Sequence, residues 1–180
     1  VPPVSWTALL ACPRCGGPVQ PAQPPREPGW QCLGPCGTHW ETVEGIPRLF
    51  EAHEGSGLTE TVRGFYEDAP FPEYAPTDSV VTLLGRSRSN PFTRLLDAEV
   101  ALDARVLELG CGTGQLSNLL AMASRTVVGA DLSVASLSRA RAFADANGIR
   151  AAIVHMNLFR PCFRPGSFDL VIANGVLHHT

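Results

Sequence analysis

Short apolar runs alternate with longer amphipathic stretches along the second half of the chain. Between the runs, Gln115 to Ser124 and Ser133 to Asn147 show helical patterning, and the second stretch has a good N-cap residue at Ser133 and a stop at Asn147-Gly148. Alternation of strands and helices predicts a parallel α/β sheet. The four runs expected to form its strands are Val106 to Leu109, Thr126 to Ala130, Ala151 to His155 and Phe168 to Ala173.

The first half of the chain has a different pattern. Residues 1–57 are rich in Pro and Gly, a composition poor in helix and strand interiors, so something other than a large core must order them. Residues 58–102 carry helical patterning at Leu58 to Tyr66 and Pro91 to Leu102, interrupted by the turn-forming Ala69 to Pro72. We therefore expect a small domain at 1–57, a helical connector at 58–102 packed on the next domain, and an α/β domain at 103–180.

Composition narrows the classes of partner. The net charge is -3, and all fourteen positive charges are scattered arginines, so nucleic acid is not the default partner and a small molecule is expected. No apolar run is long enough for a bilayer span, and the start lacks the pattern of a secretory signal, which together predict a cytoplasmic protein with no membrane partner. Because the chain starts at Val1 and stops at Thr180 inside a motif, we expect it to be a fragment.

A glycine-rich turn follows the first apolar run of the α/β part. Glu108-Leu109-Gly110-Cys111-Gly112-Thr113-Gly114 leads directly into a helix, where a nucleotide ligand meets backbone N–H groups. Asp131 ends the second run, where a carboxylate can accept hydrogen bonds from ribose hydroxyls. A dinucleotide fold would have Gly or Ala at the position of Gln115, so NAD is the second choice of cofactor.

This arrangement resembles motif I of the class I S-adenosylmethionine-dependent methyltransferases, and the resemblance runs from about residue 92 to the end. It implies the first four strands of a Rossmann-like parallel sheet, out of seven in the family, and therefore an exposed edge at the fourth strand. We expect the 180 residues to be unstable or inactive on their own.

The resemblance also implies a cofactor site. Gly110, Gly112 and Gly114 should line the methionine part of S-adenosylmethionine, Glu108 should lie beneath its amino group, and Asp131 should hold the ribose. The place of the acidic residue that usually meets the adenine amino group is taken by Asn157, whose amide oxygen can still accept that bond. The remaining residues expected at the site are Cys111, Leu132, Leu158 and Asn174. Cys111 sits where the family tolerates any small residue, and Cys162 has no nearby cysteine partner, so both are expected to be ordinary thiols.

Residues 168–179 resemble motif IV, which faces the transferred methyl group. His178 and His179 follow its strand, and either could take a proton from an acceptor hydroxyl or amine; the alternative is that both only pack or line the pocket. Residues 65–72, with the sequence Phe-Tyr-Glu-Asp-Ala-Pro-Phe-Pro, resemble a segment of uncharacterised small methyltransferases. The aromatic residues Phe65, Tyr66, Phe71 and Tyr74 could form a lid, but we favour their plugging the connector onto the core.

Four cysteines of the first segment form two pairs. Cys12 and Cys15 are separated by sixteen residues from Cys32 and Cys36, a spacing suited to two knuckles around one tetrahedral zinc. His39 could replace one of the thiolates. Less favoured alternatives to zinc are free thiols without a metal and disulfides. The segment resembles the zinc ribbons of some ribosomal RNA guanine methyltransferases, although its second knuckle has one extra residue. A structural role is favoured over recognition of RNA because the segment has no basic face.

Three functional classes follow from these patterns: a small-molecule methyltransferase, an RNA methyltransferase that uses the ribbon for recognition, and a non-catalytic cofactor-binding protein. The low positive charge favours the first over the second, and only turnover separates the third from both. The sequence does not specify the methyl acceptor.

Overall fold

The computed structural model describes residues 5–24, 27–54 and 57–177. Within them, eight strands form one sheet in the order β1-β2-β3-β4-β7-β6-β5-β8. The last four strands in that order are mutually parallel, as expected. They span Ala152–Met156 for β7, Thr126–Asp131 for β6, Arg105–Leu109 for β5 and Leu170–Ala173 for β8.

The cysteine-bearing segment contributes the other four strands. They are β1 (Val19–Pro21), β2 (Gly29–Cys32), β3 (His39–Val43) and β4 (Ile46–Leu49), which pair antiparallel in sequence order after the short 3-10 helix η1 (Trp6–Leu9). The segment therefore forms strands although its Pro- and Gly-rich composition is poor in residues typical of strand interiors. β4 pairs in parallel with β7, so the sheet runs across the boundary expected at residue 57.

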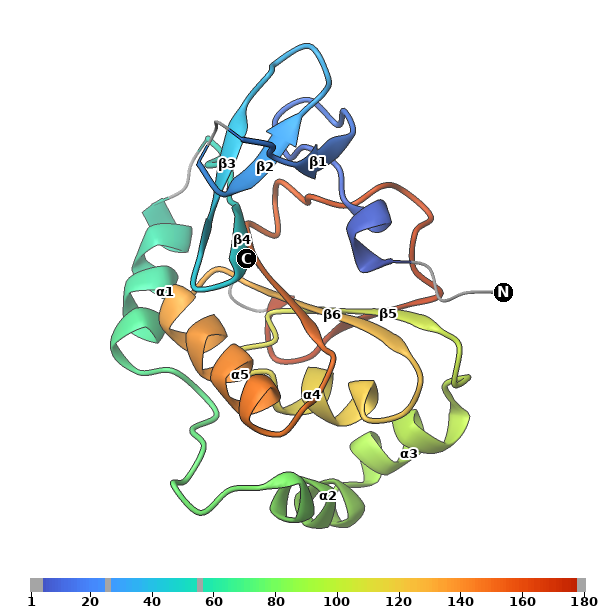
Figure 1. Ribbon diagram of the computed structural model, residues 1–180. Coiled ribbons are helices and arrows are strands. Elements are labelled where there is room, and N and C mark those ends of the chain that lie inside the picture. The colour runs from blue at the N-terminus through green and yellow to red at the C-terminus, as the bar shows by residue number, and fades with distance from the viewer. Residues whose placement is uncertain (1–4, 25–26, 55–56, 178–180) are drawn as a thin grey trace.

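Helices cover one face of the parallel strands (Figure 1). α4 (Gln115–Ala121) and α5 (Val134–Ala146) follow β5 and β6. The apolar side chains of α5 pack on Ile153 from β7, while Leu120 of α4 packs on Val106 and Val127. Ser133 caps α5 by accepting a hydrogen bond from the Ser136 backbone N–H, and Gly148 follows the helix with φ of 64°, which confirms both predicted ends.

The other face of the same strands is covered by the cysteine-bearing segment. Side chains alternate along a strand, so Leu107, Val128 and Val154 point away from the helices. They form one core cluster with Leu10, Trp30 and Trp40 of that segment and with Cys162 and Phe163 of the loop after β7. The segment thus shares the core of the parallel sheet.

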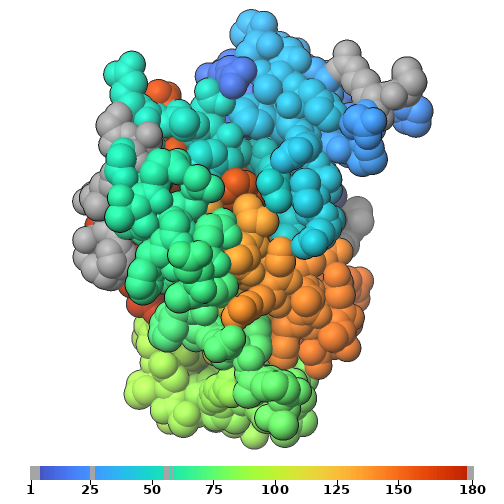
Figure 2. Space-filling model, turned by 90° about the vertical axis from the view of Figure 1, so that its left-hand side faces the viewer, coloured from blue at the N-terminus to red at the C-terminus, as the bar shows by residue number. Residues whose placement is uncertain are grey.

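Three helices of the connector complete the fold. They are α1 (Gly57–Asp68), α2 (Val80–Ser89) and α3 (Pro91–Glu99); α2 lies within the connector expected to be helical, although its own residues were not singled out. α2 starts with β-branched residues, yet Ser79 and Thr82 form a reciprocal capping box at its N-terminus. Figure 2 shows α1 lying beside α5, with the strands of the cysteine-bearing segment above it and α2 below.

β8 lies at the end of the sheet, as predicted. Among the described residues it pairs with β5 alone, and the side chain of Val171 is 52% exposed.

No helix in the described part of the chain is long and apolar enough to span a bilayer.

Candidate cofactor cavity and tetracysteine centre

A cavity of about 590 Å³ lies at the carboxyl ends of the parallel strands, within the size range of small-molecule sites. Nine of the ten residues predicted for the cofactor line it, so motifs far apart in sequence do converge. The exception is Gly114, which has φ of 73° and whose missing Cβ would lie 2.7 Å from the Ala140 side chain. Gly114 therefore allows α4 to approach α5 and does not face the cavity. The nine lining residues are Glu108, Gly110, Cys111, Gly112, Asp131, Leu132, Asn157, Leu158 and Asn174.

Two carboxyl groups, the buried one of Glu108 and the partly buried one of Asp131, are the only acidic groups among the described lining residues. Glu108 accepts a hydrogen bond of 2.5 Å from Ser117, and burial raises its pKa to about 7. Asp131 accepts hydrogen bonds of 2.8 Å from the backbone N–H groups of Gly112 and Ser133. Burial also raises the pKa of Asp131, while these backbone bonds act in the opposite direction. Both groups are held rigidly with acceptor capacity left.

Asn157 is less accessible than predicted for a direct adenine contact. Its side-chain amide donates to the Glu51 carbonyl at 2.8 Å and lies 3.1 Å from His53 Nδ1, and its oxygen accepts from the Phe159 backbone N–H at 3.0 Å. The residue is only 1% exposed. Asn157 thus joins the segment after β4 to the loop after β7 at this end of the cavity, a role that sequence spacing did not reveal.

The connector forms the rest of the cavity wall. Tyr66 and Phe71 line it, whereas Tyr74 stacks on Phe143 at 4.2 Å and accepts a hydrogen bond from Asn118. The favoured role of a plug on the core is therefore seen for Tyr74, whereas Tyr66 and Phe71 line the cavity and Phe65 is exposed. The opposite wall comes from α2, α3 and α4, with Leu83, Arg86, Ser87, Asn90, Phe92 and Leu116. The lining residues of α2 were not predicted for the cavity, because this helix was not singled out in the sequence.

The remaining predicted side chains are placed as follows. Burial raises the pKa of Cys111 and of Cys162, which disfavours a reactive thiolate at either position. His178 and His179 lie outside the described residues, so their proposed proton transfer stays a prediction.

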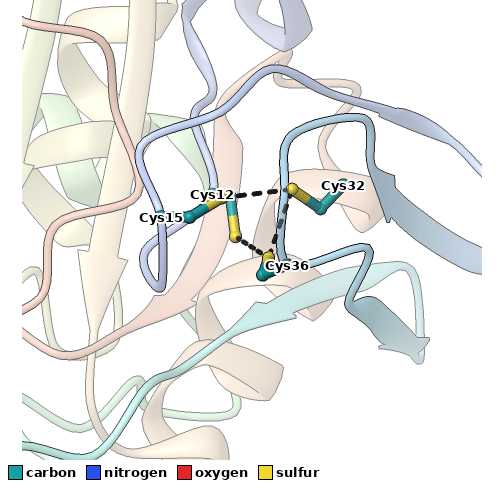
Figure 3. A group of neighbouring side chains, drawn as sticks. All are labelled: Cys12, Cys15, Cys32 and Cys36. Carbon is teal, nitrogen blue, oxygen red and sulfur yellow. Dashed lines mark hydrogen bonds between the residues drawn. The ribbon is translucent and has the colours of Figure 1, made fainter.

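Cys12, Cys15, Cys32 and Cys36 converge on one point (Figure 3). Their sulfur atoms all lie within 4.8 Å of one another, and the closest pairs are 3.4 and 3.5 Å apart. All six cysteines are free, and a disulfide would need a separation of about 2 Å. Four thiolates around one zinc would be about 3.8 Å apart, so the geometry fits a tetrahedral ion. His39 does not belong to this cluster.

The thiols of the cluster differ in acidity. Burial raises the pKa of Cys12 and raises that of Cys32 to about 12, whereas hydrogen bonds from Thr38 lower the pKa of Cys36 to about 6. A bound metal ion deprotonates coordinating thiols. Cys36 is the thiol best prepared for this deprotonation.

Comparison with known proteins agrees with the fold. Residues 106–180 match the family model described as a methyltransferase domain. A structure of magnesium protoporphyrin IX methyltransferase from Synechocystis PCC 6803 with bound S-adenosylhomocysteine is 24% identical, with a TM-score of 0.50 over 64% of this chain and 57% of that chain. A second structure of that enzyme, with bound S-adenosylmethionine, is 22% identical, with a TM-score of 0.52 over 72% of this chain and 67% of the other. No curated protein sequence gives a significant match.

The α/β part of the chain is therefore similar to a methyltransferase domain. Its glycine turn and the acidic residue at the end of the second parallel strand resemble those of class I S-adenosylmethionine-dependent methyltransferases. The family match covers residues 106–180, which is less than half of the chain. The chain covers only about half to two thirds of the length of the two Synechocystis structures.

Proposed function

We propose that the protein binds S-adenosylmethionine in the cavity and transfers its methyl group to a small-molecule acceptor. The observation that carries this proposal is the convergence of nine predicted site residues, including the buried Glu108 and the partly buried Asp131, on one cavity. The hydroxyl of Ser136 adds support, because it lines the same cavity, is 1% exposed and has no hydrogen-bond partner among the described residues. A polar ligand would satisfy it.

Different residues of the cavity would bind different parts of the cofactor. Asp131 would accept hydrogen bonds from the ribose, Glu108 would pair with the amino group, and the turn from Gly110 would admit the methionine part without a side chain in the way. When bound, S-adenosylmethionine supplies a methyl group on a positively charged sulfur. The protein's own contribution is to orient the acceptor and to exclude water, which can account for most of the rate. A base is optional, and His178 and His179 remain the candidates.

The wall formed by α2 and α3 favours an apolar, uncharged acceptor. Leu83 and Phe92 supply apolar surface there, with the hydroxyl and amide groups of Ser87 and Asn90 between them. Arg86 is the only cation among the described lining residues, and Asp78 already binds it at 2.6 Å. The Arg86 charge is therefore largely neutralised, which disfavours an acceptor rich in phosphate such as RNA.

The test is a calorimetric titration with S-adenosylhomocysteine. Asp131→Ala should abolish measurable binding, whereas the control Asp145→Ala, on the exposed side of α5, should leave it unchanged. NADH should not bind. If the wild-type protein fails to bind S-adenosylhomocysteine, or binds NADH instead, the proposal is wrong.

We also propose that the four cysteines hold one zinc ion and that the protein works in the reducing cytoplasm. The support is the cluster of four thiols, free of disulfides, at the spacing of a tetrahedral site. A chelator should release about one zinc per chain. Metal-free protein with the same Tm as the protein before chelation would contradict this proposal.

A further inference from the structure

The first cysteine knuckle is attached to the loop that follows β7. The Ala11 backbone N–H donates to the Cys162 carbonyl at 2.8 Å, and the Arg164 backbone N–H donates to the Leu9 carbonyl at 2.9 Å. The Arg164 guanidinium donates to the Leu10 carbonyl at 3.2 Å. Leu10 and Cys162 are fully buried behind these bonds. The extended segment that leads into Cys12 therefore lies beside residues 160–164 and forms hydrogen bonds with them.

Arg14, between the two cysteines of that knuckle, makes a second attachment. Its guanidinium donates to both carboxylate oxygens of Glu51, at 3.1 and 2.9 Å, and to the Thr38 hydroxyl at 3.1 Å. It also lies over the Trp40 ring, 5.6 Å from the centroid. Thr38 in turn donates to Cys36 Sγ at 3.3 Å. Arg14 therefore connects both knuckles to Glu51, two residues after the end of β4.

Glu51 and its neighbour His53 reach the end of the cavity. The Glu51 carbonyl accepts from the Asn157 amide, and the His53 ring stacks on Phe159 with 4.3 Å between centroids. Asn157 and Phe159 both line the cavity. A continuous set of contacts thus runs from the cysteine cluster through Arg14 and Glu51 to the cavity wall.

We infer that the tetracysteine centre positions the loop at residues 157–164 and thereby sets the affinity for the cofactor, with Arg14 as a positioning residue. A bound metal fixes both knuckles, and groups around a metal centre transmit its geometry to their partners. This inference rests on the proposed function, because it concerns the same cavity. On this inference the ribbon supports the cofactor site and does not recognise the substrate.

The test compares Arg14→Gln with Arg141→Gln in the zinc-loaded protein. Arg141 forms an ion pair with Asp145 of similar length, and the two arginine side chains are 50% and 37% exposed, which makes Arg141→Gln a matched control. Zinc content, S-adenosylhomocysteine affinity and amide hydrogen exchange are measured together. Because the Arg14 pair is partly exposed, we expect its loss to weaken binding by about two- to five-fold. Exchange of the Phe159 amide, which is bonded to Asn157, should accelerate by a similar factor.

A global loss of stability would accelerate exchange at all protected amides, including those of α5, so a selective effect at residues 157–164 distinguishes positioning from general destabilisation. Unchanged affinity and unchanged Phe159 exchange in Arg14→Gln and in Glu51→Gln, with zinc retained, would overturn the inference. If the wild-type protein does not bind S-adenosylhomocysteine, the proposed function fails, and the exchange measurement still decides whether the centre positions the loop.

Discussion

The two faces of the parallel sheet are built in different ways. The face under α4 and α5 is covered by helices that follow their strands directly along the chain. The opposite face is covered by η1, the first knuckle and the loop after β7, which are brought together from distant parts of the sequence. The helical face depends on local patterning, whereas the ribbon face depends on a cluster of cysteines and on long-range pairing. A perturbation of one face should therefore be distinguishable from a perturbation of the other.

The largest effect is expected from disrupting the proposed metal centre with Cys32→Ser. The three tryptophans, at positions 6, 30 and 40, all belong to the ribbon face, so tryptophan fluorescence reports on that face while far-UV circular dichroism is dominated by the helices. Loss of zinc should lower the fluorescence-detected Tm by about 10 °C. Cys162→Ala, a buried cysteine outside the cluster, should keep its zinc. Identical shifts in both signals would show that the two faces unfold as one unit.

A pH titration of Glu108 probes the helical face. The pKa of about 7 means that Glu108 is protonated in the free protein below pH 7, while a cofactor ammonium group favours the ionised carboxylate. Affinity for S-adenosylhomocysteine should rise with pH up to about 7, by at most about ten-fold per pH unit. Glu108→Gln should lack this rise. A pH-independent affinity in the wild-type protein would remove Glu108 from contact with the amino group.

Whereas a rise in pH should increase the affinity for the cofactor, it should decrease the contribution of Glu108 to the stability of the fold. The unfolded chain releases this proton near pH 4.5, whereas the folded protein retains it to about pH 7, so the contribution of Glu108 to stability falls as pH rises between these values. His155 opposes this trend, because burial lowers its pKa to about 4. The difference in unfolding free energy between wild type and Glu108→Gln, followed by urea denaturation, isolates the Glu108 contribution. A constant difference from pH 4.5 to 7 would contradict it.

The smallest expected effect concerns the contact between α1 and α5. Glu67 accepts hydrogen bonds from the backbone N–H groups of Val134 and Ala135, at 2.7 and 2.9 Å, and so places a negative charge at the N-terminus of α5. Glu67→Gln should lower the unfolding free energy by about 1 kcal/mol, measured by urea denaturation. Glu60→Gln, whose partner lies within α1 itself, is the control and should change it much less. Equal effects would mean that the Glu67 contact is unimportant.

Sequence patterning predicted the helical face better than the ribbon face, for physical reasons. The turn from Glu108 to Gly114 and the cap at Ser133 are local, and each specifies its own conformation. The pairing of β4 with β7 has no local signal, and Pro47 within β4 even argues against a strand with neighbours on both sides. Asn157 lines the cavity, but its bonds to Glu51 and His53 depend on that same pairing and could not be predicted from spacing.

The attachment of the first knuckle also has a consequence for the order of folding during synthesis. The cysteine cluster closes over a separation of 24 residues, but the bond from Arg164 to Leu10 joins residues 154 positions apart. A ribosome therefore delivers a complete ribbon long before the loop on which it docks. Until then the side chains of Leu10 and Trp30 lack the parallel strands on which they pack, so the four cysteines can come together in the nascent chain before its core is complete.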